Sequence, residues 1–220
     1  MRINRIVEMI KGGDVLLDIG TDHGEVIIEA FKRGYIKKAI ATDINEGPLK
    51  RAYLNISNAG LLDKVKFIQT DGFNNVNEGY NVVNITGLGY NTIREILEKP
   101  HKRPKFYVFG VQSEIEAFRK FLSDSGYKII GEELVFDKKF YVFIKTIFAS
   151  EKLSEEDIIL GPILKTKKES IPYYKNKITK LKRKVPHYEG EKLEQIKQEI
   201  NIYLQAIKNL QLPTANRFTL

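Results

Sequence analysis

The stretch VLLDIGTDHG, residues 15–24, joins a short apolar run to a polar loop that contains two glycines. An apolar run of this length is typical of a buried strand in a parallel sheet. Gly20 and Gly24 allow the backbone to approach a ligand closely where that strand ends. Ligands of open α/β sheets bind at the carboxyl ends of the strands. The stretch therefore predicts an α/β fold with a ligand site directly after its first strand.

Strand-like and helix-like segments alternate around this stretch. Apolar runs predict further strands at 39–44, 65–69, 80–86 and 106–109. Helical spacing of apolar residues predicts helices at 3–10, 25–33, 48–59, 91–98 and 113–124. Two strand-like runs, 128–136 and 140–148, are joined by only three residues, a connection too short for a crossover. We expect five β–α units and a terminal hairpin, which together form a mostly parallel sheet with one antiparallel strand over residues 1–149.

The last third of the chain has a different pattern. Apolar residues recur in steps of three and four over 171–185, and the pattern restarts over 193–210. Such spacing is typical of helices that bury one stripe against each other. Pro186 and Gly190 interrupt the pattern, so the two helices should fold back on each other. We expect an antiparallel helical hairpin, or coiled coil, over residues 170–212, after a linker at 150–169.

The positive charge of the chain is concentrated in one segment. The 220 residues include 36 basic and 28 acidic side chains, a net charge of +8, and residues 165–184 alone contain nine basic residues and one acidic residue. A local basic excess is typical of a phosphate-binding face, although a solvated helix face is the alternative. The candidate RNA-binding residues are Lys165, Lys167, Lys168, Lys175, Lys177, Lys180, Lys182, Arg183 and Lys184.

The composition excludes several classes of protein. The chain has no cysteine, which excludes a disulfide scaffold, a thiolate nucleophile and cysteine-ligated metal sites. Its three histidines are widely spaced, which argues against a metal centre. No apolar run approaches the roughly 20 residues of a membrane span, and the chain opens without a signal-peptide core. We expect a soluble cytoplasmic protein that binds neither metal nor membrane.

An acidic residue follows each of the first three predicted strands. Asp18 is placed to engage an ammonium group, Asp43 both hydroxyls of a ribose, and Asp71 an adenine amino group. Each acid alone could simply cap the next helix. The glycine pattern lacks the third glycine that seats a pyrophosphate. The ordered set therefore predicts S-adenosyl-L-methionine as cofactor. The candidate cofactor-binding residues are Asp18, Ile19, Gly20, Thr21, Gly24, Asp43, Ile44, Asp71, Gly72 and Gly87.

Several motifs of the chain resemble the bacterial tRNA (adenine-22-N1)-methyltransferases. They are residues 18–23, Glu46-Gly47-Pro48, Asp71-Gly72 and Gly87-Leu88-Gly89, together with residues 161–164 and the helical pair. The resemblance covers nearly the whole chain. It implies a Rossmann-like methyltransferase sheet, S-adenosyl-L-methionine as cofactor, tRNA as partner, and methyl transfer to N1 of adenine 22 in the D-arm.

Two stretches depart from the pattern of that family. Tyr90 stands where the family has the last glycine of an AGMGG stretch, and residues 109–112 replace a Leu-Gln-Pro-Asn stretch. Both departures follow predicted strands on the side of the target base. They leave open a catalytically impaired, RNA-binding relative of the methyltransferases. A small-molecule methyltransferase, which would not need the basic helical hairpin, is a third possibility.

The acceptor chemistry favours a ring nitrogen. An exocyclic adenine amino group needs strong acceptors, typically an Asn/Asp-Pro-Pro-aromatic motif, and residues 84–87 contain no proline. Adenine N1 already carries an in-plane lone pair and needs positioning on a flipped or unpaired base. Asp22 and His23 are candidates to orient the base or stabilise its charge, and Tyr90 to stack on it. Asn84 completes the candidate catalytic set. The alternatives are a loop role for His23 and a packing role for Tyr90.

Overall fold

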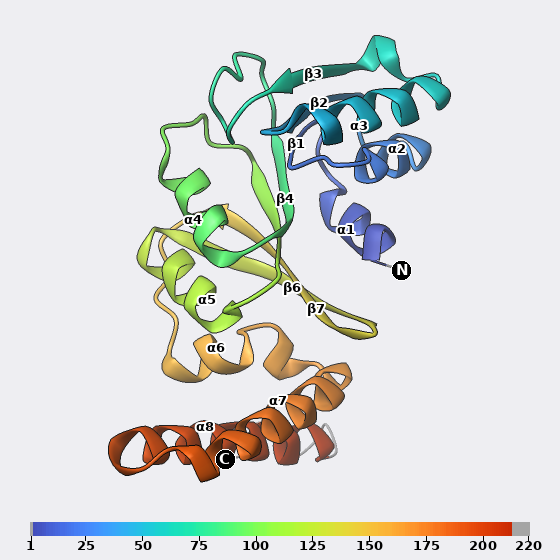
Figure 1. Ribbon diagram of the computed structural model, residues 1–220. Helices are drawn as coiled ribbons and strands as arrows, with labels where there is room; N and C mark the ends of the chain where they lie inside the picture. Colours follow the sequence, from blue (N-terminus) through green and yellow to red (C-terminus); the bar gives the residue numbers. More distant parts are fainter. Residues whose placement is uncertain (1, 213–220) are drawn as a thin grey trace. The chain divides into compact units, whose positions relative to one another are not determined.

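The computed structural model describes residues 2–212 and divides the chain into two compact units, with the boundary after Glu151. The first unit is a sheet flanked by helices, and the second is helical (Figure 1). Over the described residues, no helix combines the length and apolar character that a membrane crossing needs. The same part of the chain brings together no three His, Asp or Glu side chains that could hold a metal ion.

The sheet of the first unit has seven strands in the order β3-β2-β1-β4-β5-β7-β6. The strands are β1 (Val15–Ile19), β2 (Lys38–Asp43), β3 (Val65–Gln69), β4 (Val82–Leu88), β5 (Phe106–Val111), β6 (Tyr127–Asp137) and β7 (Lys139–Phe148). β1 pairs in parallel with both β2 and β4, so it lies at the centre of the parallel part. β7 is antiparallel to β5 and β6. The predicted Rossmann-like sheet with one antiparallel strand is confirmed.

Helices cover both faces of this sheet. α1 (Arg2–Ile10), α2 (Glu25–Lys32) and α3 (Glu46–Asn58) lie on one face, and α4 (Tyr90–Glu98) and α5 (Ile115–Asp124) on the other (Figure 1). A short 3-10 turn, Leu62–Lys64, precedes β3. The expectation of five β–α units was wrong in one respect, because residues 70–81 connect β3 to β4 without a helix. The helix predicted at 113–124 also begins two residues later, because α5 starts after Glu114.

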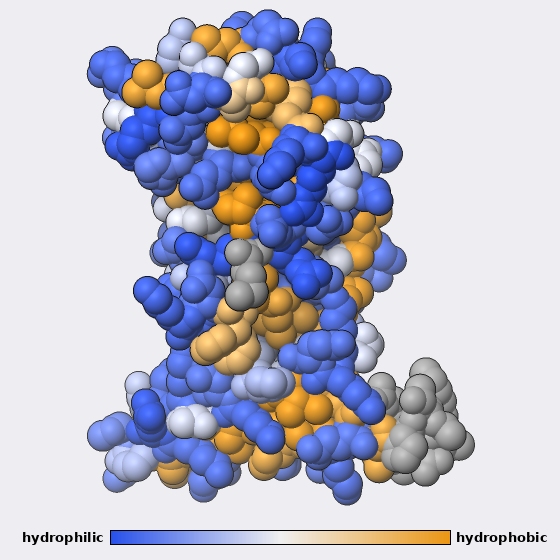
Figure 2. All heavy atoms as spheres, turned by 90° about the vertical axis from the view of Figure 1, so that its right-hand side faces the viewer, coloured by the Kyte–Doolittle hydropathy of each residue, from blue (hydrophilic) through white to orange (hydrophobic). Residues whose placement is uncertain are grey.

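The end of the β6–β7 hairpin extends beyond the sheet. β5 pairs only with residues 142–146 of β7, so the paired residues beyond them form a two-stranded ribbon. An isolated ribbon is only marginally stable in water. α1 supports this one through the ion pair of Arg2 with Asp137 (3.2 Å), and Arg5 pairs with Glu133 (3.6 Å) in the adjoining part of β6. The side on which α1 and the ribbon lie shows hydrophobic atoms between hydrophilic side chains (Figure 2).

The second unit contains α6 (Glu155–Leu160), α7 (Ile171–Lys184) and α8 (Gly190–Gln211), with 3-10 turns at 164–166, 168–170 and 185–187. α7 and α8 lie side by side and are joined by residues 185–189, as expected for the helical hairpin (Figure 1). The rings of Tyr174 and Tyr203 are 5.5 Å apart between them. Their hydroxyls donate to the carbonyl oxygens of Leu160 (3.0 Å) and Ile159 (3.3 Å), which fastens α6 to the pair.

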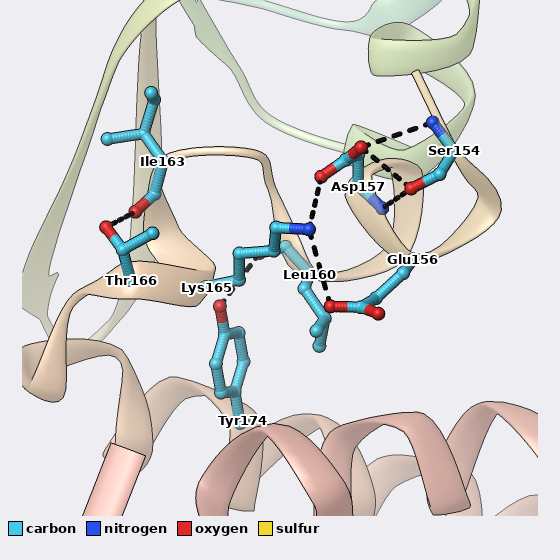
Figure 3. A network of polar contacts seen from close by, with 8 residues as sticks. All are labelled: Ser154, Glu156, Asp157, Leu160, Ile163, Lys165, Thr166 and Tyr174. Atoms are coloured by element: carbon cyan, nitrogen blue, oxygen red, sulfur yellow. Dashed lines mark hydrogen bonds and ion pairs between the residues drawn. The ribbon is translucent and has the colours of Figure 1, made fainter. Parts of the chain in front are cut away.

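The interval expected to be a linker, residues 150–169, is largely ordered secondary structure. Ser154 caps α6 through a capping box with Asp157, in which each side chain bonds the other residue's backbone N–H. Lys165 then pairs with Asp157 (2.8 Å) and Glu156 (3.4 Å), which ties the turn after α6 back to that helix (Figure 3). The sequence signal was the Ser-x-x-Asp pattern at 154–157, which marks a helix start.

A buried ion pair joins α5 to the edge of the sheet. Arg119 Nε lies 2.9 Å from Glu132 Oε1, and both side chains are completely buried. Removing one partner of such a pair leaves an uncompensated charge in a poorly solvated site.

We expect Glu132→Ala to lower the free energy of unfolding by about 3–5 kcal/mol, measured by urea denaturation. The control is Lys120→Ala on the same helix, which breaks an exposed pair with Asp124 and should cost less than about 1 kcal/mol. Equal effects of the two substitutions would contradict a structural role for the buried pair.

Candidate functional site

A cavity of about 580 Å³ opens at the carboxyl ends of the parallel strands. It brings together most of the residues proposed from the sequence, although they come from three strands and the loops that follow β1, β2 and β3. The predicted residues that line it are Asp18, Ile19, Gly20, Thr21, Asp22, His23, Asp43, Ile44, Asp71, Gly72 and Gly87. Gly24, Asn84 and Tyr90 do not line it.

Asp18 is the most buried charged group of the cavity, with 2% of its surface exposed. Its two carboxylate oxygens accept hydrogen bonds from the Thr21 hydroxyl (2.8 Å) and from the Asn84 side-chain amide (2.7 Å). Burial raises the pKa of Asp18, and the hydrogen bonds from Asn84 and Thr21 oppose that rise. Nearby Asp43 raises the pKa slightly further. The carboxylate is thus held in one orientation at the base of the cavity.

Asn84 has a different position from the one its catalytic assignment requires. It lies opposite Asp18 in the pairing of β4 with β1, is 1% exposed, and does not reach the cavity surface. Its amide nitrogen donates to Asp18 and also lies 3.2 Å from the Thr86 hydroxyl. Asn84 is therefore placed to position the Asp18 carboxylate and not to contact an acceptor base.

The loop after β1 is tied to the neighbouring strand. The backbone N–H groups of Gly20 and Thr21 both donate to the Thr42 carbonyl, at 2.9 and 3.0 Å. Gly20 adopts φ +76°, and a Cβ there would still be 3.8 Å from Leu88, so the glycine leaves open space on the cavity side. Gly24 acts differently, because a Cβ there would lie 2.9 Å from the Ile56 side chain. Gly24 thus permits close packing of α2 on α3 and supports the loop from behind.

The other two strand-end acids are less buried than Asp18. Asp43 accepts a hydrogen bond from the Asn45 backbone N–H (2.9 Å), which fixes one of its carboxylate oxygens. Asp71 forms an ion pair with Lys99 at the end of α4, a partner that the sequence did not suggest. Beside it, Gly72 adopts φ +67° and packs against Ile96. Ile44, with 61% of its surface exposed, adds an apolar side chain at the cavity.

Asp22 and His23 stand at the exposed part of the cavity. Asp22 pairs with Arg51 of α3 at 2.9 Å, and His23 Nε2 lies 3.6 Å from the Asp22 carboxylate. The His23 carbonyl accepts a hydrogen bond from the Asn55 side chain at 2.9 Å. Asp22 adopts a left-handed φ of +47°, a conformation uncommon outside glycine. These contacts fix the loop while leaving the imidazole of His23 half exposed.

Tyr90 does not take the position that stacking on a base would require. It is the first residue of α4, and its ring packs edge-on against Phe118 and Phe121 of α5, with ring centroids 6.3 Å apart in each case. The packing alternative considered from the sequence describes this residue. The replacement of glycine by tyrosine at this position therefore leaves the cavity open.

Part of the cavity comes from residues that sequence reasoning did not select. They include Arg2, Ile3 and Ile6 of α1, Thr86 of β4, Gly110 of β5 with Gln112 directly after that strand, and Tyr141 and Phe143 of β7. The sequence signals lie at the ends of strands, whereas β7 is antiparallel and brings its beginning to this edge of the sheet. The departure from the family pattern at 109–112 was the one signal that pointed here.

The carboxylates on the acidic side of the cavity match the hydrogen-bond donors of S-adenosyl-L-methionine, which are its ammonium, ribose hydroxyl and adenine amino groups. A buried carboxylate at Asp18 suits an ammonium group, and Asp43 lies at the next strand end, where a ribose would follow. The open space at Gly20 allows a ligand to lie against the backbone between them. The residues present therefore fit the cofactor proposed from the sequence.

The predicted RNA-binding residues differ in their exposure and in their contacts. Lys165 forms ion pairs with Asp157 and Glu156, which give it a structural role beside α6. Lys177 is half-buried, with its ammonium 5.7 Å from the Tyr173 ring centroid. Lys167 is also half-buried. The exposed members are Lys168, Lys175, Lys180, Lys182, Arg183 and Lys184.

We expect Asn84→Leu to weaken binding of S-adenosyl-L-methionine roughly 5- to 100-fold, because Asp18 loses a buried hydrogen bond. The loss of that donor also raises the Asp18 pKa further. Since an ammonium group needs the ionised carboxylate, affinity is full above this pKa and falls as the pH drops through it. Calorimetric titration at several pH values should show this fall beginning at a higher pH in the variant. An unchanged pH dependence would contradict the role of Asn84.

Comparisons with known proteins agree with this geometry. A family model described as a methyltransferase domain matches residues 1–144. A Mycoplasma pneumoniae protein whose proposed activity is that of a tRNA methyltransferase is 33% identical over 193 residues, covering 81% of this chain and 88% of that protein. The tRNA (adenine(22)-N(1))-methyltransferase of Bacillus subtilis is 32% identical over 98 residues, 44% of this chain and 41% of that enzyme.

A solved structure extends the likeness over both units. The structure of M. capricolum TrmK in complex with S-adenosyl-homocysteine is 28% identical, with a TM-score of 0.83, and covers 94% of this chain and 97% of that one. The assignment of the chain to a family rests on the match to the family model and on the long alignment with the Mycoplasma pneumoniae protein. The chain belongs to the methyltransferase domain family and, within it, to the TrmK-like group of bacterial tRNA (adenine-22-N1)-methyltransferases.

Proposed function

We propose that the protein transfers a methyl group from S-adenosyl-L-methionine to N1 of adenine 22 in the D-arm of tRNA. The observation that carries the proposal is the cavity at the strand ends, where a buried, oriented carboxylate at Asp18 faces the same space as Asp43 and Asp71. The relatives named as tRNA methyltransferases support the choice of tRNA and of adenine 22 as substrate.

The residues of the chain would act mainly by binding and orientation. S-adenosyl-L-methionine, when bound, supplies a methyl group activated by a positive sulfonium centre. Asp18 would hold the ammonium group, Asp43 the ribose hydroxyls and Asp71 the adenine amino group. Because adenine N1 carries its own lone pair, no side chain has to remove a proton before transfer. The methylated base is cationic, and the carboxylate of Asp22 near the opening would stabilise that charge.

The main reason to consider a catalytically impaired, RNA-binding relative does not hold. It rested on the two altered stretches near Tyr90 and Gly110. Tyr90 packs on α5 outside the cavity, and Gly110 lies in the cavity wall against Phe143 without closing it. Neither change fills the cavity at the strand ends.

The test is methylation of unmodified tRNA by the full chain, followed by mass mapping of the nucleosides and primer extension. We expect 1-methyladenine at position 22 and a primer-extension stop there. A tRNA with guanine at position 22 is the control and should yield neither. Methylation elsewhere, or turnover only on small molecules, would contradict the proposal.

The exposed basic residues of α7 are proposed to hold the tRNA. α7 contains no acidic residue, and its Lys180, Arg183 and Lys184 are exposed at helical spacing on one side. Contacts of this kind bind phosphates and fix register without reading the base sequence. They would therefore set the affinity for tRNA and leave the choice of the base to the cavity.

Replacing Lys180, Arg183 and Lys184 together with Gln should weaken tRNA binding and reduce its salt dependence. The slope of log affinity against log salt should fall by about 0.7–0.9 for each phosphate that the variant no longer neutralises. Fluorescence anisotropy with labelled tRNA measures both quantities. The matched control removes three exposed charges from the first unit, Lys32, Lys38 and Lys64, and should keep the slope. Equal slopes in the two variants would remove the proposed role of α7.

A further inference from the structure

The cavity at the strand ends has two chemically different sides. All the acidic residues among its described lining residues lie at the ends of β1 and β2, in the loops after β1 and β3, or at the start of α2. The side made by α1, β4, β5 and β7 contributes no acidic lining residue. It offers instead one cation, one amide, two aromatic rings and several apolar groups. A cationic cofactor suits the acidic side, and the second side suits a neutral base attached to an anionic phosphate.

The second side has an aromatic wall. Phe143 is 4% exposed, and its ring lies so close to β5 that a Cβ at Gly110 would be 2.8 Å from it. Tyr141 lies two residues earlier on the same face of β7 and is half-buried. Gly110 therefore allows the Phe143 ring to pack closely against the strand. The result is an apolar wall of the cavity, beside which a planar base can lie.

Two cations lie at the rim of this wall. The Arg2 guanidinium is 4.7 Å from the centroid of the Tyr141 ring, and the Lys139 ammonium is 5.1 Å from it. Arg2 also pairs with Asp137 at 3.2 Å, which holds its guanidinium over the ring. Lys139 is exposed. The aromatic surface thus carries positive charge where a nucleotide's phosphates would emerge.

Gln112 supplies a group able to read a base. Its backbone N–H donates to the Leu88 carbonyl (3.0 Å), which fixes the residue beside the end of β4. Its exposed side-chain amide faces Gly87, with Nε2 4.0 Å from where a Cβ would be. Within residues 2–212 this amide has no hydrogen-bond partner. A Gln amide pairs with N6 and N7 of adenine and leaves the N1 edge uncovered.

We propose that this second side holds the acceptor nucleotide, with Gln112 selecting adenine through N6 and N7, Tyr141 and Phe143 forming the apolar wall beside the base, and Arg2 and Lys139 binding its flanking phosphates. This inference rests on the proposed function and adds to it a recognition site in the first unit, in addition to the basic helix α7. Gln112 acts here as a specificity residue, because its pairing leaves N1 free for the methyl group.

The test of Gln112 is a double-mutant cycle between protein and substrate. The full chain and its Gln112→Leu variant are assayed on tRNA with adenine or 7-deazaadenine at position 22, which lacks the N7 acceptor. We expect kcat/KM of the unchanged protein to fall about 10-fold with 7-deazaadenine. Gln112→Leu should lose at least as much on adenine and nothing further on 7-deazaadenine. Calorimetry should show unchanged affinity for S-adenosyl-L-methionine, which separates this loss from damage to the cofactor side.

The phosphate contacts are tested by binding without turnover. Arg2→Gln with Lys139→Gln should lower the salt slope of tRNA binding by about 1.4–1.8, measured by fluorescence anisotropy in the absence of methyl donor. The control, Lys32→Gln with Lys64→Gln, removes the same charge from exposed positions outside the cavity lining and should leave the slope unchanged.

The possible results separate the two proposals. Two results would overturn the acceptor site while the unchanged protein still methylates adenine 22. One is that Gln112→Leu and 7-deazaadenine each lower kcat/KM by their full factor when they are combined. The other is an equal salt slope of tRNA binding in the two charge variants. Failure of the unchanged protein to methylate adenine 22 in unmodified tRNA would overturn the proposed function, and the acceptor site with it.

Discussion

The hydrogen bond between Asn84 and Asp18 is the interaction on which the site depends. β1 and β4 are adjacent in space but 66 residues apart in the chain, and their pairing places these two side chains directly opposite each other. A buried carboxylate is stable only where hydrogen bonds compensate for the lost water. Asn84 and Thr21 provide that compensation, and they also fix the direction of the carboxylate. The proposed cofactor side of the cavity is built around this one oriented charge.

The antiparallel strand β7 also shapes the site. In a fully parallel sheet, every strand would present only its last residues at the ligand edge. Because β7 runs the other way, Tyr141 and Phe143 near its beginning reach the same edge, and Gly110 of β5 makes room for the Phe143 ring. α1 closes this side with Arg2 and supports the ribbon beyond the sheet. The cavity is therefore completed by the two ends of the first unit's sequence.

The basic character of residues 165–184 divides between structure and surface. Lys165 compensates the acids that begin α6, whereas the exposed residues of α7 have no acidic neighbour in their own helix. A count of charges cannot separate these roles, because the partner of Lys165 lies eight residues back in a segment that looks like a linker. The ordered turn around Asp157 and Lys165 is what distinguishes them.

The sequence alone determined the sheet type, the helical hairpin and the cofactor side of the site, because these depend on local periodicity and on which residues follow each strand. Asp18, Asp43 and Asp71 could be chosen without coordinates, since parallel strands always bring their carboxyl ends together. Only the tertiary structure decided that Asn84 supports Asp18, that Tyr90 packs on α5, and that α1 and β7 form the opposite wall. Those contacts join residues far apart in the chain, and the direction in which a side chain points from its strand or helix is fixed by packing, which local sequence pattern does not contain.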